Sequence, residues 1–227
     1  MSTENDRRNL GAGPESRMPQ QQAAGKQWEE KAQEKIEAVL GMLPEAFCKR
    51  LPGWFEEMET AGVGSLLKVA PDVLLKIIRR FREAGAAQLF SAHSPLSESF
   101  FCFLWTVVAA RAETSEELKA ALRKTKRELH VNIEAEDSPF QCHFGVSGER
   151  IRGGGGLLHF RDEDYRIMGP TETLLDLLTG DLPLGFSNLH LQTAGHSGFA
   201  GLVSPVVREI TGVIRGSGAS NVRRRPS

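Results

Sequence analysis

The stretch Pro170-Thr-Glu-Thr-Leu-Leu-Asp-Leu-Leu-Thr-Gly180 has the features of a short helix with both ends marked. A hydroxyl of Thr171 or Thr173 can cap the free N–H groups of the first turn, where the helix dipole also favours the negative charge of Glu172. Gly180 suits a left-handed cap at the C-terminal end, because it has no Cβ. One apolar stripe is predicted to face the core, formed by Leu174, Leu175 and Leu178.

Two runs with the alternation typical of strands flank this helix. His159–Met168 comes before it, and Asn188–Thr193 follows it. A last helix is predicted over Phe199–Ile214, and its firmer part is expected to start near Pro205, a residue that suits a first turn. The segment Phe160–Ile214 therefore contains a strand, a helix, a strand and a helix in that order.

Helical spacing of apolar residues dominates the chain upstream of this segment. The predicted helical segments are Trp28–Leu43, Pro44–Gly64, Pro71–Ala84, Phe100–Ala112 and Thr114–Leu129, with a loop at Phe90–Leu96. After Leu129 the apolar period changes to two, in His130–Glu136 and Phe140–Val146. Helices followed by strands favour an α+β fold, with a mainly antiparallel sheet of about five strands covered by helices and a helical N-terminal region.

Composition divides the chain into four predicted parts. Residues 1–27 have too few apolar side chains to offset the entropy of ordering, so we expect a disordered tail. Residues 28–95 form a helical N-terminal region, and residues 96–215 form the domain that contains the sheet. Residues 216–227 are expected to be a flexible basic tail that contains Arg223-Arg224-Arg225.

Charge and cysteine content narrow the class of protein. The net charge of -1 gives no overall field that would attract nucleic acid. Cys48, Cys102 and Cys142 are far apart and odd in number, which favours a reducing compartment over a disulfide framework. The N-terminus shows no apolar secretory segment, and the most apolar run, Phe100–Ala110, is too short to span a bilayer. We therefore expect a cytoplasmic protein.

No group of residues has the spacing of a known catalytic or phosphate-binding motif. Gly153–Gly156 lacks the Lys-Ser/Thr pair of a phosphate loop, so we interpret it as a flexible hairpin connection. Arg161–Asp164 lacks the spacing of a calcium loop, so we expect a solvated strand edge or turn. His196 stands beside Ser197, but adjacent residues do not normally form a nucleophile and its base.

The histidines have no zinc-binding pattern in the sequence. His143, His159 and His190 would meet only if their strands are neighbours in the sheet. We therefore predict no metal site, no cofactor and no catalytic residues, and we expect that the protein is not an enzyme.

The C-terminal part resembles the sterol-carrier-protein type two (sterol-binding) domain family, over roughly residues 128–214. The resemblance rests on the strand Asp164–Met168, the helix Glu172–Leu178, the turn Thr179–Leu184, the strand Asn188–Gly195 and the last helix. Phe140–Gly148 also looks like an earlier strand and turn of that domain. His196 departs from the family, which often has Asp after the glycine that ends this strand.

The resemblance implies a non-catalytic lipid-binding or carrier protein. Its ligand would be a fatty acyl, sterol-like or isoprenoid chain in an apolar tunnel between sheet and helices, bound by burial of apolar surface at about 25 cal/mol per Å2. The residues expected near this tunnel are Leu174, Leu175, Leu178, Phe186, Leu189, Leu191, Phe199, Leu202 and Val206. The same side chains would also fill an ordinary core.

Two other roles stay open from the sequence. A protein-interaction module or accessory factor, for example in isoprenoid-quinone biosynthesis, would have a filled core and no lipid ligand. Its upstream helices would recruit a partner protein through exposed Trp28, Trp54 or Phe55. The basic amphipathic helix Pro71–Ala84 suits transient contact with a membrane surface, although packing of its apolar stripe on the rest of the protein is the simpler expectation.

Overall fold

The chain is helical from residue 31 to residue 123 apart from short connections, as its apolar spacing predicted. The computed structural model describes residues 31–159, 161–182, 191–195 and 197–216, so the predicted disordered tail lies outside the described residues. Residues 31–40 form a first helix. The helices that follow are α2 (Pro44–Ala61), α3 (Val63–Val69), α4 (Val73–Glu83), α5 (Ala86–Ala92), α6 (Ser94–Ala112) and α7 (Glu116–Arg123).

The loop predicted at Phe90–Leu96 is wrong. Helix α5 continues to Ala92, and α6 begins at Ser94. Pro95 lies in the first turn of α6, where its missing N–H leaves no helical hydrogen bond unmade. The Ser-Pro pair therefore begins a helix here instead of interrupting one.

The upstream helices bury two of the aromatic side chains that the sequence offered as exposed anchors for a partner. Trp54 is 1% exposed and Phe55 is 3% exposed. Phe55 stacks on Phe103 of α6, with ring centroids 4.5 Å apart. Both side chains therefore belong to the core, and Trp28 lies outside the described residues.

Helix α4 packs its apolar stripe inward. The stripe residues are each at most 1% exposed: Val73, Leu74, Ile77, Ile78 and Phe81. A stripe buried in this way is not available to a membrane surface unless α4 leaves the fold. Among the described residues, no helix has the length and apolar character needed to cross a membrane.

The strands form one sheet in the order β3-β2-β1-β4-β5. Their bounds are β1 (Leu129–Ala135), β2 (Gln141–Ser147), β3 (Arg150–Gly155), β4 (Tyr165–Gly169) and β5 (Gln192–Gly195). β1 and β4 are parallel, and the other neighbouring strands are antiparallel. The predicted α+β fold with a mainly antiparallel sheet of five strands is confirmed. Strand β4 is shorter than the run predicted at His159–Met168, and residues 188–190 of the second predicted run lie outside the described part.

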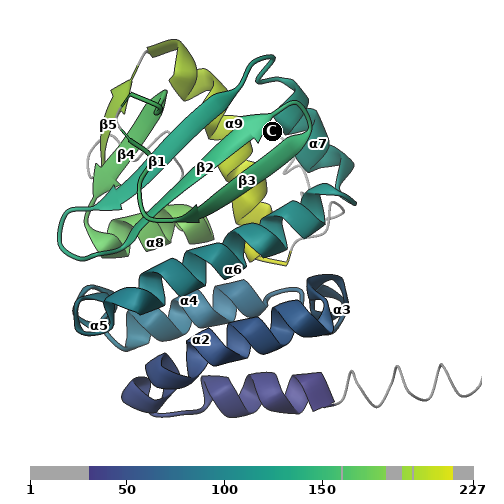
Figure 1. Cartoon of the computed structure of the whole chain (residues 1–227), viewed down its shortest axis with the longest axis vertical. Helices are drawn as coiled ribbons and strands as arrows, with labels where there is room; N and C mark the ends of the chain where they lie inside the picture. Colours follow the sequence, from purple (N-terminus) through teal and green to yellow (C-terminus); the bar gives the residue numbers. More distant parts are fainter. Residues whose placement is uncertain (1–30, 160, 183–190, 196, 217–227) are drawn as a thin grey trace, which may run out of the picture.

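The glycine run is part of a strand, so its interpretation as a flexible hairpin connection is wrong. Gly153 and Gly155 pair with residues of β2. A Cβ atom at Gly153 would lie 2.6 Å from the Trp105 ring, and one at Gly155 would lie 2.6 Å from the Cα atom of Glu98. The missing side chains therefore allow α6 to lie directly on β3 (Figure 1).

Helices α8 (Thr171–Thr179) and α9 (Ser197–Ile214) cover the same face of the sheet, and α9 passes behind the sheet in Figure 1. The cap of α8 differs from the prediction, because the N–H and hydroxyl of Thr171 both donate to Asp137 Oδ1 in the turn after β1. Gly180 ends α8 with a φ of 71°, as predicted. Helix α9 begins well before Pro205, which lies inside it.

Buried side chains from both halves of the chain form one continuous core. Phe90 of α5 and Phe101 of α6 both contact Phe140 beside β2, with ring centroids 5.0 Å and 4.6 Å apart. The division into a region of residues 28–95 and a lipid-binding domain of residues 96–215 stays a prediction.

Candidate functional site

The residues predicted to line an apolar tunnel lie in the core. Leu174, Leu175 and Val206 are fully buried, and Leu178, Leu191 and Phe199 are 3% to 7% exposed. Leu202 is partly buried and packs against the same core. Phe186 and Leu189 lie outside the described residues. The seven described members are therefore all part of, or packed against, one apolar cluster.

This cluster holds no buried titratable side chain apart from thiols and the Tyr165 phenol. In the described part of the chain, the buried polar residues are Ser97, Thr125, Asn132, Thr171 and Thr179. A ligand placed between the sheet and helices α8 and α9 would therefore meet almost only hydrocarbon.

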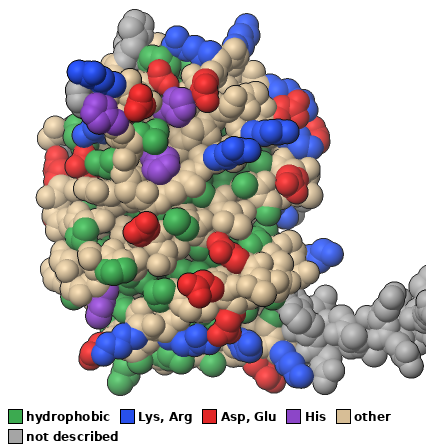
Figure 2. Space-filling model, viewed as in Figure 1, with side chains coloured by type: hydrophobic (Ala, Val, Ile, Leu, Met, Phe, Trp, Pro, Cys, Tyr) green, Lys and Arg blue, Asp and Glu red, His purple; other side chains and the backbone are tan. Residues whose placement is uncertain are grey.

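The other face of the sheet is polar, and no helix among the described residues covers it (Figure 1). Along β2, residues 142, 144 and 146 are buried on the helix side, while residues 141, 143, 145 and 147 lie on the open side. The same alternation in β1 places His130, Asn132 and Glu134 on the open face. Figure 2 shows histidine, basic and acidic side chains over the upper part of the molecule, where Figure 1 places the sheet.

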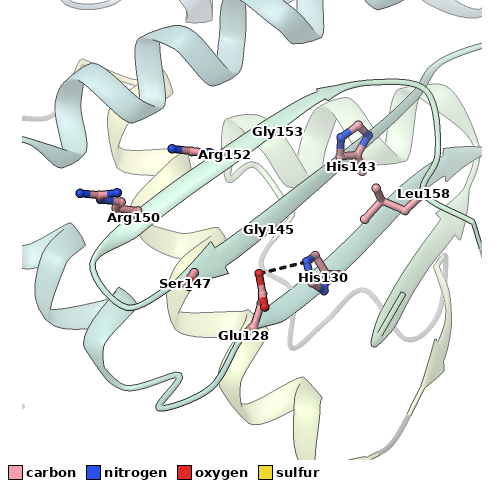
Figure 3. A pocket seen from close by; sticks show the side chains of 9 residues that line it. All are labelled: Glu128, His130, His143, Gly145, Ser147, Arg150, Arg152, Gly153 and Leu158. Atoms are coloured by element: carbon pink, nitrogen blue, oxygen red, sulfur yellow. Dashed lines mark ion pairs between the residues drawn. The ribbon is translucent and has the colours of Figure 1, made fainter. Parts of the chain in front are cut away.

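A hollow of about 450 Å3 lies on this open face. Its lining residues are Glu128, His130, His143, Gly145, Ser147, Arg150, Arg152, Gly153 and Leu158. In register, Gly145 of β2 pairs with His130 of β1 on one side and with Arg152 of β3 on the other. Gly145 has no side chain, so the floor of the hollow is backbone between two long side chains (Figure 3).

The two histidines of the hollow have defined partners. His130 lies between two carboxylates, with Nε2 3.6 Å from Glu128 Oε1 and Nδ1 3.6 Å from Asp164 Oδ2. His143 Nδ1 lies 3.1 Å from the carbonyl oxygen of Gly156. A carbonyl can only accept, so Nδ1 of His143 is assigned as the protonated nitrogen.

Two arginines form the outer wall of the hollow. Arg150 and Arg152 alternate with the buried Ile151 on the edge strand β3, so both lie on the open face. Within the described residues, neither arginine has an ion pair. The nearby Glu149 pairs with another arginine, because its Oε1 accepts a hydrogen bond from Arg123 Nε at 2.7 Å.

The predicted solvated strand edge or turn is confirmed for Arg161 and Asp162, which are exposed in a turn, and is wrong for Glu163 and Asp164, which are half-buried and bond to β1. Asn132 is fully buried and exchanges hydrogen bonds with the backbone of Leu158, at 2.9 Å and 3.1 Å. Glu163 accepts hydrogen bonds from the side chains of Asn132 and Arg166. The hydrogen bond between Arg166 and Glu163 raises the pKa of Arg166. Asp164 accepts the N–H of His130 at 2.8 Å. These contacts hold Leu158 at the rim of the hollow.

The sequence left open whether His143, His159 and His190 come together. The structure brings His143 together with His130 at one hollow, and His190 lies outside the described part. Across the described residues, no three His, Cys, Asp or Glu side chains are grouped as metal ligands.

The sequence did not predict that Gly145, Arg150 and Arg152 line one hollow with His130 and His143. The alternation in Phe140–Val146 already placed His143 and Gly145 on one face. The register across β1, β2 and β3 brings Arg152 beside them, and no signal in the sequence fixes that register.

Comparison with known proteins gives a likeness of fold. No protein-family model matches the sequence, and no curated protein matches it. A solved structure that the fold resembles is sterol carrier protein 2 from Yarrowia lipolytica in its apo form. The two chains are 11% identical, the match covers 52% of this chain and 91% of that chain, and the TM-score is 0.34.

This is a weak likeness of fold. A TM-score of 0.34 carries no argument about a ligand. The class that the structure itself defines is an α+β protein whose sheet has one apolar, helix-covered face and one open, polar face.

Proposed function

We propose that the protein is a non-catalytic lipid-binding protein, which holds a fatty acyl, sterol-like or isoprenoid chain between the sheet and helices α8 and α9. The observation that carries the proposal is the apolar layer in which the seven described lining candidates lie. No buried carboxylate, imidazole or basic group of the described chain interrupts this layer. Binding would come from burial of ligand surface, at about 25 cal/mol per Å2.

Entry of a ligand would require an element that moves, and α9 is the best candidate. Its first turns contain the exposed residues Gly198, Ala200 and Gly201, and a Cβ at Gly201 would meet nothing within 4 Å. Glycine lowers helix stability by about 1 kcal/mol relative to alanine. We therefore infer that the start of α9 shifts outward to admit a chain, while α8 stays anchored by Asp137 and Gly180.

A carrier of this kind protects an apolar molecule from water and presents it to another protein. In the cytoplasm, such a protein would serve as a lipid carrier or as an accessory factor for enzymes that act on long-tailed intermediates. The helical N-terminal region would be the surface that meets a partner.

The test is displacement of a fluorescent polyene fatty acid by oleic acid, cholesterol and an isoprenoid alcohol. We expect saturable uptake of the probe, and loss of most of it in Val206→Phe, because the new ring fills the layer. Val63→Phe in α3 is the matched control and should bind as the parent does. Both variants are first compared by circular dichroism and thermal unfolding.

A protein that takes up none of the three lipid classes would contradict the proposal. Equal loss of uptake in both phenylalanine variants, with both still folded, would show that the site is not in the layer beside α9. A variant with the layer left intact, Val63→Phe, therefore separates loss of the site from loss of the fold.

A further inference from the structure

The hollow on the open face of the sheet has the features of an anion site. It is bounded by three strands, and its volume of about 450 Å3 lies in the range of small-molecule sites. It lies on the opposite face of the sheet from the apolar layer, so this inference is independent of lipid binding.

The shape of the hollow comes from the absence of a side chain at Gly145. On each side of this residue, a partner in register carries a long side chain, His130 on β1 and Arg152 on β3. A Cβ atom at Gly145 would lie 3.2 Å from Cδ2 of His130. A side chain at this position of the middle strand would therefore project from the floor into the hollow.

The charge of the hollow comes from Arg150 and Arg152. The two residues are two positions apart on one strand, so their Cα atoms are about 6.6 Å apart. Both are exposed, and neither has an ion-pair partner among the residues that the structure describes. Other arginines that face this sheet are occupied, since Arg166 binds Glu134 and Glu163, and Arg123 binds Glu149.

The carboxylates near the hollow do not neutralise these arginines. Glu128 lies 3.6 Å from the His130 ring on the β1 side, and Asp164 accepts the backbone N–H of the same histidine and lies 3.6 Å from its ring. The positive charge therefore lies on the β3 side of a concave surface. A guanidinium fork binds two oxygens of one anion, and two forks match the charge of a phosphate group, about −1.5 to −2 at neutral pH.

The geometry points to a binding site for a phosphate group in this hollow, with Arg150 and Arg152 as the residues that hold it and Gly145 as the residue that leaves room for it. The phosphate belongs either to a free small molecule or to a lipid headgroup, and the chemistry of recognition is the same in both cases. Leu158, held over the hollow by Asn132, would contact the rest of the ligand.

The experiment is a titration of the full chain with inorganic phosphate, followed by amide shifts in 1H–15N NMR spectra. We expect saturable shifts that centre on residues 145, 147, 152 and 153. Arg152→Gln should raise the dissociation constant for phosphate about tenfold, because a hydrogen bond to a charged group is lost. Arg79→Gln on α4 removes an equally exposed arginine far from the hollow and should have no effect.

A second variant separates shape from charge. Gly145→Val keeps every charge and adds a residue that strands favour, so the protein should stay folded while phosphate binding is lost. Unchanged phosphate binding in Gly145→Val or in the double variant Arg150→Gln/Arg152→Gln would overturn the proposal. Shifts spread evenly over all surface arginines would overturn it too.

Vesicles distinguish the two sources of the phosphate. If a lipid headgroup is the ligand, the protein should bind phosphatidylcholine vesicles only when they contain phosphatidylglycerol, and Arg152→Gln should weaken this binding. If a free small molecule is the ligand, the phosphate shifts appear and vesicle binding does not. Absence of both kinds of binding would refute the site.

Discussion

At the scale of single residues, the three cysteines have very different surroundings. Cys142 and Cys48 are buried, and Cys102 is exposed on α6. Burial raises the pKa of the Cys142 thiol well above its ordinary value and raises that of Cys48. The thiolate is the nucleophilic form, so a raised pKa leaves a smaller fraction of the cysteine as thiolate at any given pH.

We therefore expect iodoacetamide at neutral pH to modify Cys102 in the folded protein and to leave Cys48 and Cys142 unmodified. Peptide mass spectrometry identifies the alkylated residue, and unfolding in guanidinium should make all three reactive. Rapid alkylation of Cys142 in the folded protein would show that the inner face of β2 is not buried.

The two ends of helix α8 show which helix caps can be predicted from the sequence. Gly180 at the end of α8 was predictable, because the requirement for a left-handed residue is local. The cap at the start of α8 was not, because Asp137 is 34 residues away in the chain and reaches Thr171 only in the folded protein.

At the scale of elements, the contact between α6 and β3 depends on glycines of the edge strand. A Cβ at Gly153 would lie 2.5 Å from a backbone oxygen and 2.6 Å from the Trp105 ring. Neither neighbour can move without shifting α6 or β2. At Gly154, by contrast, a Cβ would meet only the side chain of His143, at 3.3 Å, on the open face.

Gly153→Ala should therefore lower the free energy of unfolding by about 1–3 kcal/mol, through overpacking between strand and helix. Gly154→Ala is the matched control, and its effect should be less than about 1 kcal/mol. Urea unfolding followed by circular dichroism measures both. Equal effects would mean that α6 does not lie directly against β3.

The elements that the sequence predicted are those with strong apolar periods. The stripe of α4 and the alternation of β1 are examples, and both are buried as expected. Gly153–Gly156 was misassigned because glycine has no side chain to give a period, and the reason for glycine there is contact with α6. The acidic residues Glu163 and Asp164 were misassigned because their partners, Asn132 and His130, lie more than 30 residues away.

At the scale of the whole molecule, Arg82 joins the helical half to the half that contains the sheet. From α4 it pairs with Asp176 of α8 at 2.9 Å and with Asp181 after α8 at 3.2 Å. Asp181 also pairs with Arg215, beyond the end of α9, at 2.8 Å. One acidic residue therefore connects α4 with the C-terminal end of α9.

We expect Arg82→Met to lower the free energy of unfolding by roughly 1 kcal/mol, since the pairs are partly exposed to solvent. Lys76→Met removes a local pair between α4 and the residue before it, Asp72, at 3.1 Å, and should have a smaller effect. The difference between the two variants should shrink in about 1 M salt, where the charges are screened. A difference that persists in high salt would contradict an electrostatic cause.

The central claim for the molecule is that the apolar layer beside α9 accepts a lipid. The most direct measurement is native mass spectrometry of the purified protein, followed by extraction and identification of any bound lipid. The account predicts a stoichiometric lipid that is lost in Val206→Phe and kept in Val63→Phe. A lipid-free mass that does not change on addition of fatty acids, sterols or isoprenoids would contradict it, and the layer would then be an ordinary filled core.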